Sequence, residues 1–230
     1  MAAIGALMLT RKMAAWGNAE HMLFGIALAL PPWIYPFTPW AARAEPGRSF
    51  KDRYATHFAV AVFVTTMVQT YFGSALFFDR LGMEYHFHTT QLMMKTPVFL
   101  YFVTIAYFTT YYAIMLTLRR PIAKRLRGVV LGVATFALCY AIAFGETFFM
   151  ASDLIEDFFS YRDRKWALVI GSIGYGILFF CTLPVFVQLA STPAEKRSSL
   201  GVLTRDILAA NMVSLCGYEV FAYLTGKPFA

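Results

Sequence analysis

Three carboxyl groups lie inside long apolar segments of this chain, where a charged side chain is costly. Glu146 interrupts the apolar run 128–151, and Glu219 and Asp206 lie in the run 204–225. A carboxyl group in apolar surroundings has a raised pKa and can stay protonated at neutral pH, which suits a general acid acting on an apolar substrate. Acids in such positions are functional candidates by default, so we predict a catalytic role for them.

The same acids also have a structural interpretation. Each could pair with a basic side chain or a hydroxyl group and fix the packing of its helix. This interpretation is favoured for Asp206, which has Arg205 beside it, and is balanced against catalysis for Glu146 and Glu219. If both apolar runs cross a membrane in the same direction, Glu146 and Glu219 lie at similar depth. Glu219 is then the expected partner of Glu146.

Three more acids follow Glu146 closely. Asp153, Glu156 and Asp157 lie at spacings that would place most of them near its face on one continued helix. Since the apolar run ends near residue 151, we expect these acids to emerge into a loop and pair with the basic residues at 162–165. The catalytic prediction therefore centres on Glu146.

A mixed-charge segment, KDRY (51–54), precedes the apolar run 55–78. Such a segment is ordinary where a chain enters a membrane. Asp52 and Tyr54 could instead help to form a polar lid over a site at that face. We therefore keep Asp52 as a further catalytic candidate and Tyr54 as a substrate-binding candidate.

A second polar segment, EYHFH (84–88), places His86 and His88 on one face of an extended chain, with Glu84 at the same parity. This resembles part of a metal site, but four histidines in the whole chain exclude the membrane di-iron oxygenases. A haem held by paired histidines is disfavoured because the histidines lie at the ends of apolar runs. His86 and His88 are expected to act in acid–base or hydrogen-bonding roles at the membrane surface, or simply to contact headgroups.

The run 96–118 is uncharged and rich in aromatic residues, among them Tyr107 and Tyr111. Tyrosines in such a run usually pack between helices or form a belt at the membrane surface. Aromatic walls would also suit a flat apolar ligand. Tyr107 and Tyr111 are therefore candidates for contact with a substrate.

The composition indicates where these residues act. Of 230 residues, 59% are hydrophobic and only 14% are charged, against about 25% charged in ordinary soluble proteins. This predicts an all-α polytopic membrane helix bundle formed as a single domain over 1–230. The net charge of +7 is distributed between apolar runs, which indicates membrane topology and argues against nucleic acid as a partner. The three cysteines lie within apolar runs and are expected to be small buried hydrophobes.

Six apolar runs are close to the ~20 residues that a helix needs to cross a bilayer. The predicted spans are 20–40, 55–78, 96–118, 128–151, 166–190 and 204–225. Prolines in the first span are expected to kink it or end it early. The distribution of Lys and Arg places the 119–127 loop in the cytoplasm and both termini outside. Residues 1–17 show no convincing signal peptide and are expected to form a terminal or interfacial helix.

Several segments in order resemble the plant cycloeucalenol cycloisomerase family. Between residues 18 and 225, the matching segments are KDRY (51–54), TYF with FFDRLGMEYHF (70–87), TLRR (117–120), AFGET (143–147), and Asp163, Arg164, Gly171, Tyr175, Pro184, Arg205, Asp206 and Glu219. The resemblance implies an isomerase that opens the 9β,19-cyclopropane ring of a cycloeucalenol-type sterol to give a Δ8 sterol, without a redox cofactor. One proton must be delivered to the cyclopropane carbon and another removed from the neighbouring ring carbon.

The resemblance gives roles to the candidates above. The predicted catalytic residues are Glu146, Glu219, Asp206 and Asp52. The predicted substrate-binding residues are Tyr54, Tyr71, Tyr85, His86, His88, Tyr107 and Tyr111. We expect no cofactor and no metal, and the expected partners are a cyclopropyl sterol and the lipid bilayer.

Departures from the family pattern shape these expectations. The chain begins near what would be the family's second membrane helix, and its short loops are typical of a bacterial homologue. A bacterial protein would lie in the inner membrane, and a eukaryotic one in the endoplasmic reticulum.

The run 96–118 has Thr and Tyr where the plant proteins carry His, which favours carboxylates over histidines in catalysis. A sterol double-bond isomerase, a non-enzymatic sterol- or lipid-binding membrane protein and, less favoured, a haem-linked electron carrier remain as alternatives.

Overall fold

Helix α8 (Ser172–Ser191) lies at the centre of this computed structural model, which describes residues 2–226. Its apolar side chains are buried on several sides, and Leu178, Phe179, Leu183 and Phe186 are each at most 1% exposed. A helix with a continuously apolar sequence is suited to such a position. The long helices that pack against it are α4 (Tyr54–Tyr71), α5 (Val98–Arg125), α6 (Gly128–Met150) and α9 (Leu200–Leu224).

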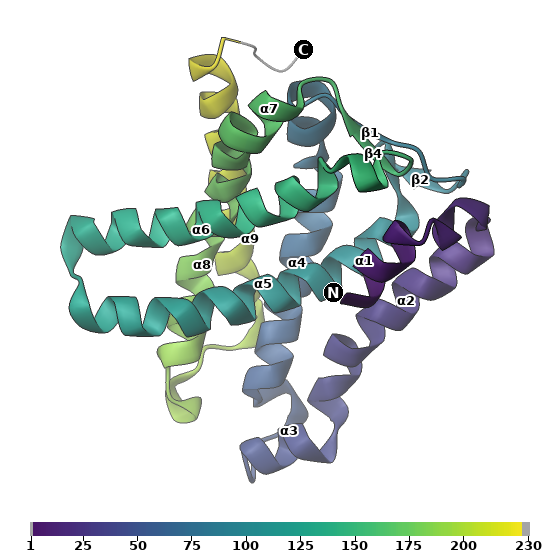
Figure 1. Cartoon of the computed structure of the whole chain (residues 1–230). Coiled ribbons are helices and arrows are strands. Elements are labelled where there is room, and N and C mark those ends of the chain that lie inside the picture. The colour runs from purple at the N-terminus through teal and green to yellow at the C-terminus, as the bar shows by residue number, and fades with distance from the viewer. Residues whose placement is uncertain (1, 227–230) are drawn as a thin grey trace.

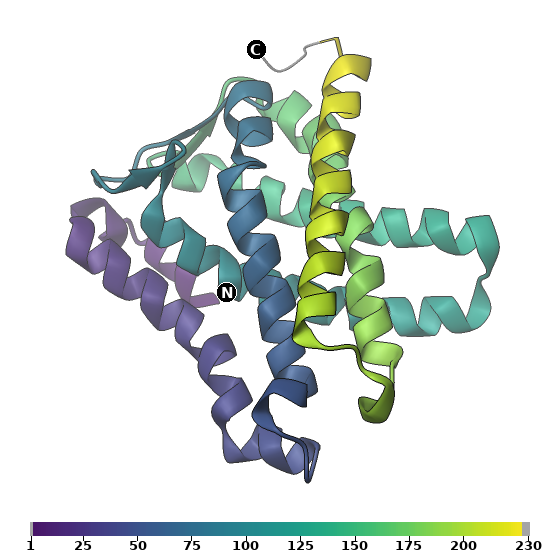
Figure 2. The same ribbon diagram turned by 180° about the vertical axis from the view of Figure 1, so that it is seen from behind.

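The helices run in two main directions. α4, α8 and α9 lie side by side, while α5 and α6 form a hairpin that crosses them and extends past them at its tip (Figure 1, Figure 2). α2 (Asn18–Ile34) packs along α5. The shorter helices are α1 (Ala2–Leu9), α3 (Pro39–Ala44) and α7 (Arg164–Trp166).

Within residues 2–226, two short antiparallel strand pairs lie beside the helices. The pairs are β1 (Met83–Tyr85) with β4 (Phe159–Tyr161), and β2 (Leu92–Met93) with β3 (Thr96–Pro97). The first pair ties the segment after α4 to the segment after α6. Gly82 precedes β1 with a φ of 62°, a conformation that favours glycine. This turn directs β1 toward β4 and holds Tyr85 beside the end of α6.

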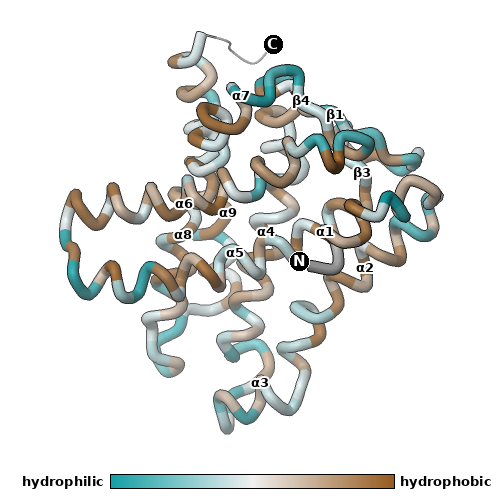
Figure 3. The backbone as a smooth tube through the Cα atoms, in the orientation of Figure 1, coloured by the Kyte–Doolittle hydropathy of each residue, from teal (hydrophilic) through white to brown (hydrophobic). Residues whose placement is uncertain are grey.

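Four helical segments of the described chain are long and apolar enough to cross a membrane, as expected of an integral membrane protein. They are Val98–Arg125, Gly128–Met150, Arg164–Ser191 and Leu200–Leu224. These segments correspond to the last four predicted spans, whereas the predicted count of about six is not confirmed. Apolar residues follow α5 and α6 along most of their length, and hydrophilic residues gather at the hairpin tip and in the connecting loops (Figure 3).

The first two predicted spans are interrupted. α2 has 17 residues and continues through Pro31 and Pro32 to Ile34. A 3-10 turn at Tyr35–Phe37, which contains Pro36, then leads into α3, so the predicted span 20–40 ends early. The predicted span 55–78 consists of α4, which ends at Tyr71, followed by a π-helical turn at Leu76–Arg80. α4 also carries buried polar residues, which make it less apolar than the four segments above.

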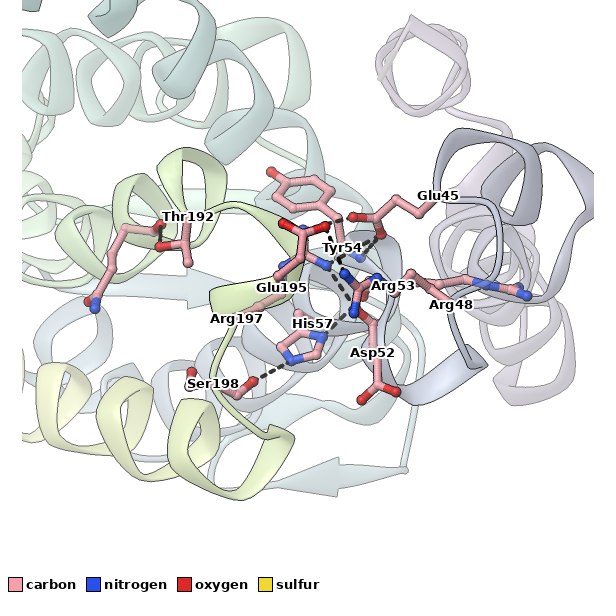
Figure 4. A network of polar contacts seen from close by, with 11 residues as sticks. Glu45, Arg48, Asp52, Arg53, Tyr54, His57, Thr192, Glu195, Arg197 and Ser198 are labelled. Atoms are coloured by element: carbon pink, nitrogen blue, oxygen red, sulfur yellow. Dashed lines mark hydrogen bonds and ion pairs between the residues drawn. The ribbon is translucent and has the colours of Figure 1, made fainter.

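A mostly buried ion pair joins the segment between α3 and α4 to the loop between α8 and α9 (Figure 4). Arg197 Nη2 lies 2.8 Å from Glu45 Oε1, and the backbone amide of Tyr54 donates to Glu45 Oε2 at 2.5 Å. The His57 ring also spans the two segments, through the carbonyl oxygens of Arg53 and Ser198. These contacts give the KDRY segment a structural role at the start of α4.

The Glu45–Arg197 pair is expected to stabilise the fold in a pH-dependent manner. Burial alone would raise the pKa of Glu45, but hydrogen bonds from Arg197 and the Tyr54 amide outweigh it and lower the pKa below its usual value of 4.5. Such a carboxylate stabilises the fold above its unfolded-state pKa and loses that effect as the pH falls through the folded-state value. Since breaking a buried pair costs about 3 kcal/mol, Glu45→Gln should lower the Tm at neutral pH by roughly 6–12 °C.

Thermal unfolding in detergent, followed by circular dichroism at neutral pH and in steps below pH 4.5, measures this effect. The Tm of the Glu45→Gln variant should also decline less steeply in acid, because it has lost the titrating group. Glu195→Gln, which removes an exposed pair with Arg48, is the matched control and should change the Tm little. Equal losses in the two variants would contradict the assignment.

Candidate active site

Glu146 lies one turn before the end of α6, where residues of α5 and α8 reach it. The Tyr175 hydroxyl of α8 donates a hydrogen bond to Glu146 Oε2 at 2.5 Å. The Tyr111 hydroxyl of α5 also hydrogen-bonds to this carboxyl group. Residues of three helices, α5, α6 and α8, therefore meet at one acid.

The partners of Glu146 are neutral. Within residues 2–226 it forms no ion pair, and no Lys, Arg or His lines any of three pockets that contain it. The structural interpretation of this acid allowed a basic side chain or a hydroxyl group as its partner. In the described chain no basic side chain pairs with Glu146, whereas the tyrosine hydroxyls do, and these contacts are compatible with helix packing as well as with catalysis. A carboxyl group held only by hydroxyl groups is able to give and take a proton without breaking a salt bridge.

Glu146 lies where the three pockets meet. An interior pocket of about 80 Å³ extends toward α4 and α9, where Gln69 and Tyr218 line it. A second pocket, of about 60 Å³, lies against the strand residues Tyr85 and Phe159. The third is an open groove of about 420 Å³ between α5 and α6, which Gly5 of α1 also lines. We call this third space the α5–α6 groove.

The sizes of these spaces limit what each can hold. A water molecule needs roughly 10–15 Å³ of such volume, so the interior pocket has room for several waters but not for a four-ring molecule. Small-molecule sites usually measure about 300–1,000 Å³, and the α5–α6 groove falls in this range. A large apolar ligand that meets Glu146 would therefore lie in the groove.

Three of the predicted substrate-binding tyrosines gather around Glu146. Tyr107 and Tyr111 line the α5–α6 groove with it, and their ring centroids are 5.7 Å apart. Tyr85 lines the interior pocket and the strand-side pocket. Burial raises the pKa of Tyr85, and the neighbouring Glu146 adds to this effect, so Tyr85 is suited to donating a hydrogen bond rather than to acting as a base.

The other predicted catalytic acids lie elsewhere. Glu219 is exposed on α9 and lines none of the three pockets. Asp206 is bound by its neighbour Arg205, with Arg205 Nη2 3.0 Å from Asp206 Oδ1. Asp52 is exposed at the start of α4 and accepts a hydrogen bond from Ser49. The expectation that Glu219 partners Glu146 is not supported, because helix α9 presents Tyr218 to the pocket while Glu219 is exposed.

The remaining candidates are also separate from Glu146. His86 and His88 are exposed and line a different pocket, and His86 Nε2 lies 2.7 Å from Ser160 Oγ. Tyr71 is half-buried with its ring edge against Phe72. Tyr54 lies beneath the Arg197 guanidinium in the ion-pair network described above. None of these four residues lines the pockets that contain Glu146.

The acids after Glu146 leave the apolar region, as predicted. Asp153 contacts Arg164, and Glu156 Oε1 lies 3.5 Å from Arg164 Nη2. Asp157 instead pairs with Arg11, at 3.0 Å, from the other end of the chain. These exposed pairs place the three acids outside the group around Glu146.

Sequence reasoning gave no site role to Tyr175, Gln69 or Tyr218. Gln69 donates hydrogen bonds to Asn211 and Ser214 at 2.8 Å, and the Tyr218 hydroxyl donates to Gln69 Oε1 at 3.0 Å. The buried amide of Gln69 inside an apolar run was a usable signal, whereas the pairing of Tyr175 with Glu146 depends on how α6 meets α8. In the described part of the chain, no three His, Cys, Asp or Glu side chains gather closely enough to hold a metal ion.

Comparison with known proteins adds one relationship. Cycloeucalenol cycloisomerase of Arabidopsis thaliana is 26% identical to this chain over 203 residues, which cover 85% of this chain and 71% of the plant protein. No protein-family model matches the chain, and no solved structure matches it. The chain is therefore distantly related to a plant protein that is named as an isomerase.

Proposed function

We propose that this protein is a membrane sterol isomerase that opens the 9β,19-cyclopropane ring of a cycloeucalenol-type sterol to give a Δ8 sterol. The observation that carries the proposal is the position of Glu146, an acid held by tyrosine hydroxyls at the edge of a groove large enough for an apolar ligand. The distant relationship to a protein named cycloeucalenol cycloisomerase supports the choice of reaction. The apolar helices around the groove suit a substrate that is dissolved in the bilayer.

In the proposed reaction Glu146 begins as the general acid. The bond between carbons 9 and 19 of the sterol breaks as its electron pair takes the Glu146 proton at carbon 19, which becomes a methyl group. Positive charge develops at carbon 9. The 8β hydrogen then leaves as a proton, and its bonding pair forms the double bond between carbons 8 and 9. Substrate and product have the same formula, so the reaction needs no oxidant and no reductant.

We assign the proton removal to the Glu146 carboxylate as well. The cyclopropane methylene and the 8β hydrogen project from the same face of the sterol, so one carboxyl group placed on that face can serve both steps. Among the described residues that line the three pockets, Glu146 is the only acid. Its hydrogen bonds from Tyr175 and Tyr111 would stabilise the carboxylate between the two steps.

Two aromatic residues are placed to stabilise positive charge in this proposal. Tyr107 and Tyr111 line the groove beside Glu146. The face of an aromatic ring attracts a cation within about 6 Å of its centroid, with an energy of about 2 kcal/mol when water is excluded. We assign Tyr107 and Tyr111 to stabilising the charge that develops at carbon 9.

The test is to supply cycloeucalenol to membranes that contain the protein and to analyse the sterols formed. Obtusifoliol should accumulate, and in deuterium oxide it should carry one deuterium in the newly formed methyl group. Membranes lacking the protein are the control. If folded protein leaves cycloeucalenol unchanged but consumes a Δ8 sterol, the activity is that of a double-bond isomerase. If it binds sterols and converts none, the enzyme assignment is wrong.

A further inference from the structure

Five basic residues gather at the tip of the α5–α6 hairpin, away from Glu146. They lie in the sequence RRPIAKRLR, which ends α5 and leads through a sharp turn at Gly128 into α6. Gly128 has a φ of 54°, which permits this short connection. The hydrophilic residues at the tip adjoin apolar stretches of both helices (Figure 3).

Part of this cluster lines a cleft of about 340 Å³ between the end of α5 and the end of α8. The basic residues that line it are Arg119, Arg120, Lys124 and Arg127. Its apolar lining comes from Leu116 of α5 and from Val187 and Ala190 of α8, which form the wall that faces α5. The cleft therefore combines a positively charged rim with an apolar wall, and it joins segments about 70 residues apart in the sequence.

The cations in the cleft are not neutralised by the protein. Arg119, Arg120 and Lys124 form no ion pair with any residue between 2 and 226, and Arg127 donates only to backbone carbonyl oxygens at Ala123 and Leu126. Elsewhere, Arg11, Arg48, Arg164 and Arg197 each pair with an acid. Concentrated, unpaired cations repel one another, so they favour an anion between them.

We propose that this cleft binds the phosphate headgroup of an anionic phospholipid, with an acyl chain along the apolar wall from α8. Both helices that form the cleft belong to segments long and apolar enough to cross a membrane, and the cleft lies at their ends. Phosphate groups of the bilayer surface lie at the level where spanning helices end. Guanidinium groups bind phosphate oxygens in pairs, which suits Arg119 and Arg120.

The ordinary function of basic residues in a membrane loop is to set topology, which requires only their number and their side of the membrane. That function does not require an apolar wall contributed by α8. The lipid site predicts that filling the cleft, with every charge kept, weakens lipid binding. The topology function predicts no such effect.

Native mass spectrometry of the full chain in detergent tests the proposal, with phosphatidylglycerol and phosphatidylcholine of the same acyl chains as probes. The wild-type protein should bind phosphatidylglycerol at least tenfold more tightly than phosphatidylcholine. The triple variant Arg119→Gln, Arg120→Gln, Lys124→Gln should lose roughly 100-fold in affinity for phosphatidylglycerol, since each cation contributes about fivefold. The control variant Lys12→Gln, Arg162→Gln, Lys165→Gln removes the same charge from exposed positions elsewhere and should bind as the wild type does.

A second variant, Ala190→Phe, fills the apolar wall and keeps all cations, so it tests the cleft even if the triple variant fails to fold. It should also lower phosphatidylglycerol affinity at least tenfold. Inorganic phosphate at millimolar concentration should not displace the lipid. Equal binding of the two lipids, equal losses in the triple and control variants, wild-type affinity in Ala190→Phe, or displacement by free phosphate would each overturn the proposal.

Discussion

Replacing Glu146 with Gln is expected to lower the turnover of a cyclopropyl sterol by roughly 10²–10⁴-fold, the usual contribution of one general acid–base group. The amide has nearly the same size as the carboxyl group, and its oxygen can still accept the hydrogen bonds of Tyr175 and Tyr111. It cannot deliver a proton to carbon 19 or accept one from carbon 8. The loss should therefore appear in kcat, with sterol binding and Tm close to those of the wild type.

The matched control is Glu219→Gln, which makes the same chemical change at an exposed position on α9. It should retain wild-type turnover. The measurement is sterol conversion by purified, reconstituted protein, with thermal unfolding followed in parallel. If Glu146→Gln changes the Tm and leaves turnover intact, then Glu146 only packs helices. If Glu219→Gln also abolishes turnover, two acids are needed and the assignment of both proton transfers to Glu146 is wrong.

The sequence predicted the acid more readily than its surroundings. A single carboxyl group within an apolar run has an energetic cost that a reader of the sequence can recognise, and Glu146 stands out for that reason. Tyr107 and Tyr111 were predicted from their aromatic run, and both line the groove with Glu146. Tyr175 received no site role, because its distance from Glu146 depends on the packing of α6 against α8 and leaves no periodic pattern.

Glu219 illustrates the opposite case. Its depth along an apolar run resembled that of Glu146, but depth does not determine which face of a helix a residue occupies. Adjacent helical residues point about 100° apart, so Tyr218 lines the interior pocket while Glu219 is exposed. In a helix that is apolar all round, hydrophobic periodicity is too weak to tell the two faces apart.

The number of spans was harder to predict than the presence of helices. Length and apolarity were sufficient to predict the last four membrane-spanning segments, because each contains few charged residues. The first two predicted spans combine apolar residues with prolines or buried polar groups. After α2 the chain turns at Tyr35–Phe37, and helix α4 buries His57 and Gln69 against its neighbours. Such polar groups are satisfied by tertiary contacts, which single-sequence analysis does not see.

Filling the α5–α6 groove is expected to lower kcat/KM roughly 10²-fold without harming the fold. Gly145 lines the groove one residue before Glu146, and a Cβ atom placed there meets no other atom within 4 Å. Gly145→Phe should therefore be accommodated, and it should not weaken helix α6, because phenylalanine has a higher helix propensity than glycine. The new ring would occupy the space proposed for the sterol and displace its reacting carbons from the acid.

Gly132→Phe is the matched control, because a Cβ at Gly132 also meets open space on the same helix but far from the groove. It should leave both kcat/KM and Tm nearly unchanged. Conversion assays over a range of sterol concentrations, with the Tm of both variants, distinguish the outcomes. Wild-type kcat/KM in folded Gly145→Phe would mean that the substrate reaches Glu146 from another side. The interior pocket, which is too small for a sterol as it stands, would then have to open between α4 and α9 during each turnover.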